Sequence, residues 1–177
     1  MIKKISSLAI VFSSVLIIAA VPASRQADIR DHPTCPICNM DRQEYAHSRM
    51  LIRQKEGDAG TCSIHCTAAH IAVNRDKRII EILVADYGSR HLIRAKTAFW
   101  VIGGDRGGVM TLRAKWAFAN ESDAAAFIRD HGGRQATYDE ALKATFEDMY
   151  TDIKAVRQRS IERKTRQESS PLPQDRP

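Results

Sequence analysis

The chain has 177 residues, of which 44% are hydrophobic and 27% are charged, as in ordinary soluble globular proteins. This length leaves room for one compact domain or two very small ones once a signal and a tail are subtracted. The net charge of +6 comes partly from Lys3, Lys4 and an arginine-rich C-terminal segment. It does not indicate a nucleic-acid partner, and we expect none.

Residues 1–23 have the three parts of a secretory signal. Lys3 and Lys4 give the positive start, residues 5–20 the apolar core, and small residues precede a cleavage point at Ser24. The alternative is an uncleaved anchor, because an apolar stretch of this length just spans a bilayer of about 30 Å. No cysteine closely follows the apolar core, so no lipoprotein signal is seen. We therefore expect an exported, periplasmic protein, anchored in the inner membrane if the signal is uncleaved.

Residues 24–45 are predicted to form a metal-binding N-terminal loop, with an extended lead over residues 28–34. This loop contains the motif Cys35-Pro36-Ile37-Cys38-Asn39-Met40. Cys35 and Cys38 have the spacing of a metal knuckle or a redox pair. Met40 adds a thioether, and thiolate together with thioether favours Cu(I) over harder metals. A buried, gap-filling Met40 is the alternative.

A second group of donors lies in the next stretch, where strands are predicted at 46–55, 61–63 and 78–87 and a helix at 64–74. Helical spacing places Ile64, Ala68 and Ile71 on one face. Cys66 and His70, four residues apart, share a different face. The donors of this group are Cys62, His65, Cys66 and His70.

The four cysteines allow three chemistries besides Cu(I) binding. An exported protein with four cysteines often forms two disulfides. Four thiolates also suit a closed structural zinc site. Cys35 and Cys38 alone could act as a thiol-disulfide oxidoreductase, although nothing in the sequence obviously lowers a thiol pKa there. We prefer a site for Cu(I), with zinc as the alternative metal and no enzymatic activity.

The second half of the chain repeats the order of elements in the first. Strands are predicted at 96–102, 115–119 and 135–137, with a helix at 124–131 that ends at two glycines. Residues 46–138 therefore predict two similar ββαβ units in tandem, in an α+β fold. The glycine-rich segment 103–108 lacks the spacing of a phosphate-binding loop. The second unit has no thiols, so we expect it to be scaffold.

A long helix is predicted at 139–165, followed by a disordered tail at 166–177. The helix has an apolar stripe made of Leu142, Phe146, Met149, Ile153 and Val156. Such a stripe either packs back onto the domain or contacts another chain, in a homodimer seam or in the groove of a partner. Both interpretations remain open from the sequence.

The chain resembles the NosL family of exported copper-binding proteins, which are accessory to nitrous oxide reductase maturation. The resemblance covers about residues 35–142. Besides the Cys35–Met40 motif, it rests on residues 99–110 (FWVIGGDRGGVM), Trp116-Ala117-Phe118-Ala119, the stretch from Asp123 to Gly133, and Thr137-Tyr138-Asp139-Glu140. Family members are typically lipoproteins, which this sequence does not match.

The resemblance implies an α+β fold of two ββαβ units and a role in binding and delivering Cu(I). Cys38 and Met40 match the family's ligand pair. The implied partners are a client cuproenzyme or its assembly factors, with membrane association and a homodimer as further expectations. The complete set of candidate metal ligands is Cys35, Cys38, Met40, Cys62, His65, Cys66 and His70.

Overall fold

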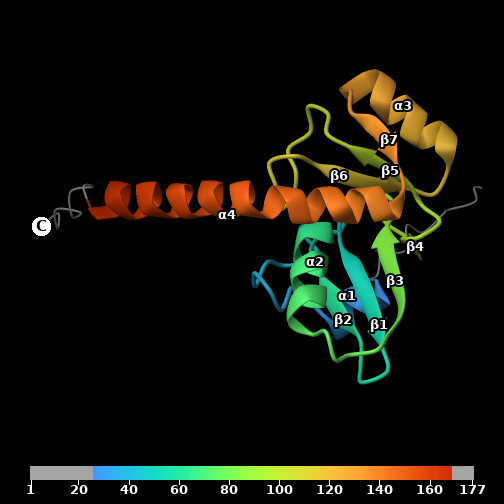
Figure 1. Cartoon of the computed structure of the whole chain (residues 1–177), viewed down its shortest axis with the longest axis horizontal. Coiled ribbons are helices and arrows are strands. Elements are labelled where there is room, and N and C mark those ends of the chain that lie inside the picture. Colours follow the sequence, from blue (N-terminus) through green and yellow to red (C-terminus); the bar gives the residue numbers. More distant parts are fainter. Residues whose placement is uncertain (1–25, 169–177) are drawn as a thin grey trace, which may run out of the picture.

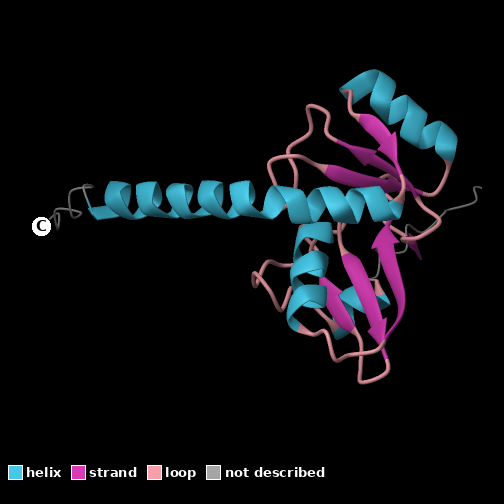
Figure 2. Ribbon diagram, in the orientation of Figure 1, coloured by secondary structure: helices cyan, strands magenta, loops and turns pink. Residues whose placement is uncertain are grey.

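The computed structural model describes residues 26–168, so the predicted signal and residues 169–177 lie outside the described residues. The elements, in order, are α1 (Ala27–Asp31), β1 (Met50–Gln54), β2 (Ala59–Thr61), α2 (Ile64–Val73), β3 (Ile79–Ala85), β4 (Leu92–Arg94), β5 (Phe99–Ile102), β6 (Lys115–Phe118), α3 (Glu121–His131), β7 (Arg134–Ala136) and α4 (Tyr138–Glu168). This is a mixed α+β fold with antiparallel sheets and a long C-terminal helix, as predicted (Figure 2).

The first sheet has the strand order β2-β1-β3-β4, and all its pairs are antiparallel. Met50, at the start of β1, lies opposite Thr61 in β2 and Val84 in β3. Its side chain is fully buried. The β-branched and apolar run of β3 suits this central position, because such side chains pack well on a pleated surface.

The second sheet has the strand order β6-β5-β7, also antiparallel. Trp100 in β5 lies opposite Ala117 in β6 and Ala136 in β7, and small residues on both sides leave room for its indole. The ring is 1% exposed, and its Nε1–H donates to the Ala95 carbonyl at 2.9 Å. A buried tryptophan with its N–H satisfied is a favourable core residue.

Helices α2 and α3 each follow a strand after a connection of two residues. Ser63 precedes α2 and Asn120 precedes α3, each with the extended backbone of an N-cap. Acidic residues in the first turn of α3 and basic residues in its last turn complement the helix dipole. Gly132, at φ 73°, ends this helix in a conformation that glycine adopts readily.

Helix α4 contacts both halves of the molecule. It packs on α2 and on β5, and Figure 1 shows its C-terminal part projecting beyond the rest of the described chain. Its packed face carries Ala141, Ala144 and Thr145, all buried. Of the predicted apolar stripe, Phe146 and Ile153 are 43% and 51% exposed. Leu142 and Met149 are half-buried, and the side chain of Val156 lies outside the description.

The structure differs from the predicted elements at several places, and β2 occupies Ala59–Thr61, so the strand predicted at 61–63 was placed two residues too late. Residues 27–31 form helix α1, so the prediction of an extended lead was wrong. Strand β4 was not predicted, and α4 continues to Glu168, three residues into the predicted tail. Helix α1 and strand β4 are both short, and tertiary contacts determine their structure. Within the described residues, no helix is long and apolar enough to cross a membrane.

Candidate metal centre

The segment 35–40 forms a tight hairpin that aims two cysteines to one side. Thr34 and Asp41 form an antiparallel bridge at its base. The Cys35 N–H donates to the Met40 carbonyl at 3.0 Å, and the Asn39 N–H donates to the Cys35 carbonyl at 2.8 Å. Asn39 has φ 60°, a left-handed conformation that asparagine tolerates better than most residues. These backbone hydrogen bonds and the bridge close the loop.

The junction of β2 and α2 supplies the second pair of cysteines. Cys62 follows β2 directly, and Cys66 lies one helical turn later in α2. Their Sγ atoms are 3.6 Å apart. The Ser48 hydroxyl donates to the Cys62 carbonyl at 2.8 Å, which fixes the backbone at this bend. The end of β2 and the first turn of α2 therefore position this pair of cysteines.

The two pairs meet in space. The four Sγ atoms all lie within 4.8 Å of one another, and those of Cys38 and Cys62 are 3.4 Å apart. Cys35, Cys62 and Cys66 are at most 1% exposed, whereas Cys38 is half-buried. None of the four forms a disulfide. We call these residues the thiol cluster, and Cys38 is its contact with solvent.

Mutual hydrogen bonds shift the pKa values of the four thiols in opposite directions. Those from Cys38, Cys62 and Cys66 lower the pKa of Cys35, despite the opposing effect of burial. The same interaction with Cys35 raises the pKa of Cys62 and Cys66, and burial raises both further. The hydrogen bond with Cys35 raises the pKa of Cys38, but hydrogen bonds from Cys62 and Cys66 outweigh it and lower that pKa. Metal ions bind thiolates, so the cluster is prepared for a cation.

A buried guanidinium anchors the segment that carries the first pair. Arg42 is 0% exposed. It donates to the carbonyls of Asp28 and His32 at 2.7 and 2.6 Å, and to those of Met50 and Thr61 at 3.0 and 3.1 Å. Its Nη2 also pairs with the Asp28 carboxylate at 2.8 Å. Arg42 thus links the N-terminal segment to Thr61, the residue immediately before Cys62.

Gly60 makes room for this anchor. A Cβ built on Gly60 would lie 2.5 Å from Cζ and Nη1 of Arg42 and 2.7 Å from the Cβ of His32. Asp28 is shared with a second buried arginine, Arg49, at 2.9 Å. These supporting residues could not be identified from the sequence, because nothing in their local sequence reveals that they are buried and paired.

The thioethers of two methionines lie near this centre. Met40 is half-buried and packs against the apolar cluster that contains Cys35, Cys62 and Cys66. Met110, from the loop between β5 and β6, packs against the same apolar cluster. Aromatic side chains of the second sheet, including Trp116 and Phe118, complete that cluster. The thiols therefore lie between the first sheet's helix and the second sheet.

The two candidate histidines are placed against other partners. His65 Nδ1 lies 3.4 Å from Asp152 Oδ2 of α4, close enough for an ion pair but not aligned for a hydrogen bond. His70 Nε2 lies 3.4 Å from Gln54 Oε1. Burial lowers the pKa of both imidazoles. Among the described residues, the group close enough to share a metal ion consists of the four cysteines.

A family model named NosL matches residues 26–146. The chain belongs to the NosL family. The resemblance found from the sequence is therefore confirmed, and the match begins nine residues before Cys35. It includes both cysteine pairs, both sheets and the first part of α4.

One solved crystal structure has a fold similar to that of this chain. The crystal structure of the copper chaperone NosL from Shewanella denitrificans has a TM-score of 0.52 and 24% identity, covering 68% of this chain and 96% of that one. The solution structure of apo-NosL from Achromobacter cycloclastes has a TM-score of 0.37 and 24% identity, covering 51% and 82%. No curated protein matches the chain. At this identity the crystal structure supports the fold alone.

Proposed function

We propose that this protein is an exported Cu(I) chaperone, which holds copper in the thiol cluster and delivers it to a client cuproenzyme or its assembly factors. The observation that supports this most directly is the meeting of four sulfurs within 4.8 Å, three of them buried and Cys38 half-buried. Copper is the cargo here, so a site that both binds and releases it is required.

The donor chemistry suits this cargo. Cu(I) is soft and prefers thiolate and thioether ligands. Cys38 is the first thiol that an incoming donor can reach, and Met40 is two residues beyond it. An exposed ligand lets a client's sulfur or nitrogen enter before the chaperone's own sulfurs leave. Cys35, Cys62 and Cys66 would then retain the ion until the transfer is complete.

Structural zinc is the second candidate, because one geometric observation favours it. Four sulfurs around tetrahedral zinc at about 2.3 Å lie about 3.8 Å from one another. The Cys38–Cys62 and Cys62–Cys66 separations of 3.4 and 3.6 Å are close to that value. A closed zinc site would hold the fold together and would not release its metal. Two disulfides, or a redox activity of Cys35 and Cys38, remain further alternatives.

Metal content and X-ray absorption of the reduced full chain, loaded with Cu(I) under anaerobic conditions, distinguish these functions. We expect one copper with two or three sulfur neighbours, removable by a competing Cu(I) chelator. Cys38→Ser should weaken binding, whereas His91→Gln, an exposed histidine, should not. Zinc that persists through purification with four sulfur neighbours would replace the copper proposal with the structural one. Wild-type affinity in Cys38→Ser would remove Cys38 from the ligand set.

The two ββαβ units have different roles in this function. The first, built from β1, β2, α2 and β3, carries two of the thiols. The second, built from β5, β6, α3 and β7, is scaffold that covers the cluster with aromatic residues.

Export is part of the same proposal, and the mass of the mature protein in the periplasmic fraction tests it. A chain that retains residues 1–23 in the membrane fraction would support the anchor instead.

A further inference from the structure

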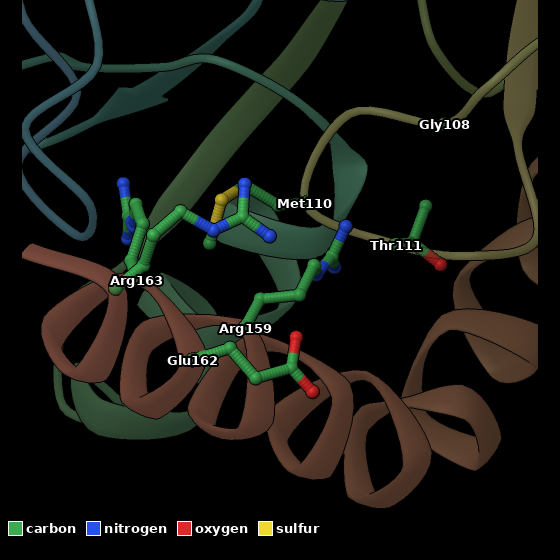
Figure 3. Close-up of a pocket in the computed structure, with 7 residues that line it drawn as sticks. Gly108, Met110, Thr111, Arg159, Glu162 and Arg163 are labelled. Carbon is green, nitrogen blue, oxygen red and sulfur yellow. The ribbon is translucent and has the colours of Figure 1, made fainter. Parts of the chain in front are cut away.

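A groove runs between the C-terminal half of α4 and the loop that joins β5 to β6. It has a volume of about 540 Å³ and is lined by Gly108, Met110, Thr111, Arg159, Glu162, Arg163 and Arg166. Figure 3 shows Arg159 and Arg163 reaching from the helix toward the segment with Met110 and Thr111. The two walls come from parts of the chain about 50 residues apart in sequence, so the groove depends on the tertiary fold.

The groove is positively charged. Three arginines line it against one glutamate, and Glu162 already accepts a hydrogen bond from Gln158 at 3.0 Å. Within the described residues, no ion pair involves Arg159 or Arg163, and both side chains are exposed. Arg159 donates to its own helix, at the Ala155 carbonyl. Guanidinium groups bind carboxylates strongly because their donors match the two oxygens.

The spacing of the arginines suits an extended peptide. Residues 159, 163 and 166 are four and three apart, so they share one face of α4. From the first to the last, the helix rises about 10 Å. Three residues of an extended strand cover a similar length. Because every second side chain of an extended strand points to the same side, about 7 Å apart, a short acidic segment can place one carboxylate near Arg159 and another near Arg163.

Met110 connects the groove to the thiol cluster. Its side chain lines the groove and also packs against the apolar cluster that contains Cys35, Cys62 and Cys66. A protein segment held by the arginines would therefore contact a side chain that packs on the apolar cluster containing three of the thiols. We propose that this groove is the docking site for an acidic segment of the protein that receives copper from the thiol cluster. This inference rests on the proposed function.

The shape of the groove favours a peptide over a lipid surface. A planar bilayer contacts convex, exposed charges, whereas Arg159 and Arg163 face the opposite wall of a concave site (Figure 3). Arg157 and Lys164 lie on the other face of α4, because each is about half a turn away from the groove arginines. These two exposed cations give a matched control with the same loss of charge.

The experiment compares Arg159→Gln/Arg163→Gln with Arg157→Gln/Lys164→Gln in the full chain. The probe is a fluorescent peptide of six glutamates, followed by fluorescence anisotropy at low salt. We expect the groove variant to lose about tenfold in affinity and the control less than twofold. Binding should weaken as salt rises. Equal losses of affinity in both variants would overturn the proposal that the groove binds an acidic segment. Binding to phosphatidylglycerol vesicles without binding to the peptide would also overturn it.

A transfer assay tests the link to copper. The acceptor is a two-cysteine peptide carrying six glutamates, compared with the same peptide carrying six glutamines. We expect faster Cu(I) transfer to the acidic acceptor, and loss of that advantage in the groove variant alone. Equal transfer rates from a copper-loaded wild type would overturn the docking proposal and leave the chaperone intact. A chain that takes up no Cu(I), while the peptide still binds, would refute the chaperone function itself.

Discussion

The two sheets present the same local structure at one place, and only one of them builds a thiol site there. Alignment of the caps Ser63 and Asn120 pairs Cys62 with Ala119 and Cys66 with Asp123. Both cysteines are 0% exposed, whereas Ala119 and Asp123 are both exposed. The N-terminal segment 26–45 covers the first junction, with Arg42 as its anchor. Burial of the thiols thus comes from the covering segment as much as from the strand and helix.

Exchange of the cysteines between the two junctions should give the largest effect. Cys62→Ala/Cys66→Ala should weaken Cu(I) binding by more than the roughly 10–100-fold that loss of an outer-shell partner costs. Adding Ala119→Cys/Asp123→Cys to that variant should not restore it, because positions 119 and 123 are exposed, whereas Cys62 and Cys66 are buried. Competition with a chromophoric Cu(I) chelator measures both. Restored affinity would show that the covering segment is dispensable.

Loosening of the covering segment should have the next largest effect. Gly60→Ala places a Cβ against the guanidinium of Arg42, and overpacking of this kind costs about 1–3 kcal/mol. Gly107→Ala is the matched control, because no atom lies within 4 Å of its added Cβ. Urea unfolding gives the difference in stability. A Gly60→Ala protein as stable as Gly107→Ala would show that Arg42 is free to move.

Removal of a carboxylate that joins the two regions should cost less. Asp86, just after β3, accepts from the Ala119 N–H at 2.9 Å and from Ser89 N–H and Oγ–H at 2.7 Å. Burial opposes its charge, but these hydrogen bonds outweigh burial and lower its pKa. Asp86→Asn should therefore lose about 1–3 kcal/mol at pH 7.

The pH dependence of this loss follows from the direction of the shift. A carboxyl whose pKa is lowered by folding stabilises the protein above its unfolded pKa of about 3.9. That stabilisation disappears as the pH falls through the folded pKa. The difference between wild type and Asp86→Asn should therefore be constant from pH 7 to about pH 5 and shrink in more acidic solution. Asp76→Asn, at an exposed site, is the control, and a difference independent of pH down to pH 2 would contradict this account.

The smallest effect is expected on the outer face of α4. Phe146→Gln/Ile153→Gln changes two side chains that are 43% and 51% exposed, so monomer stability should change by about 0.5 kcal/mol or less. Sedimentation velocity on the same variant tests the predicted homodimer seam. A fall in apparent mass relative to wild type would assign the stripe to contact between two copies. An unchanged mass would leave it as solvent-facing surface.

Long and strongly patterned elements could be predicted from the sequence. Helix α2 was expected at 64–74 and occupies Ile64–Val73, because its cap and apolar spacing are local signals. Helix α1 could not be predicted, because five residues have little intrinsic helicity and Asp28 is fixed by two distant arginines. Local sequence does not contain such partners.

The chemistry of the candidate site was easier to predict than its assembly. Motif spacing indicated cysteine ligands, and the structure brings all four together. Their convergence depends on how the N-terminal segment crosses the β1–β2 hairpin, which spacing alone does not determine. Spacing also placed His70 on the same face as Cys66, yet the structure places His70 against Gln54 of β1. The ligand role of His65 and His70 stays a prediction.

The position of α4 sets an order for the biosynthesis of this protein. Tyr138, Ala141 and Ala144 complete a core shared with Met50, Ile64 and Trp100, so the last helix to be synthesised contacts elements of both sheets. The hairpin with Cys35 and Cys38, in contrast, is among the first segments to emerge. Domains generally form only when their full set of contacts is available. The first two thiols of a newly made chain are therefore present before the contacts that complete the core around Met50, Ile64 and Trp100.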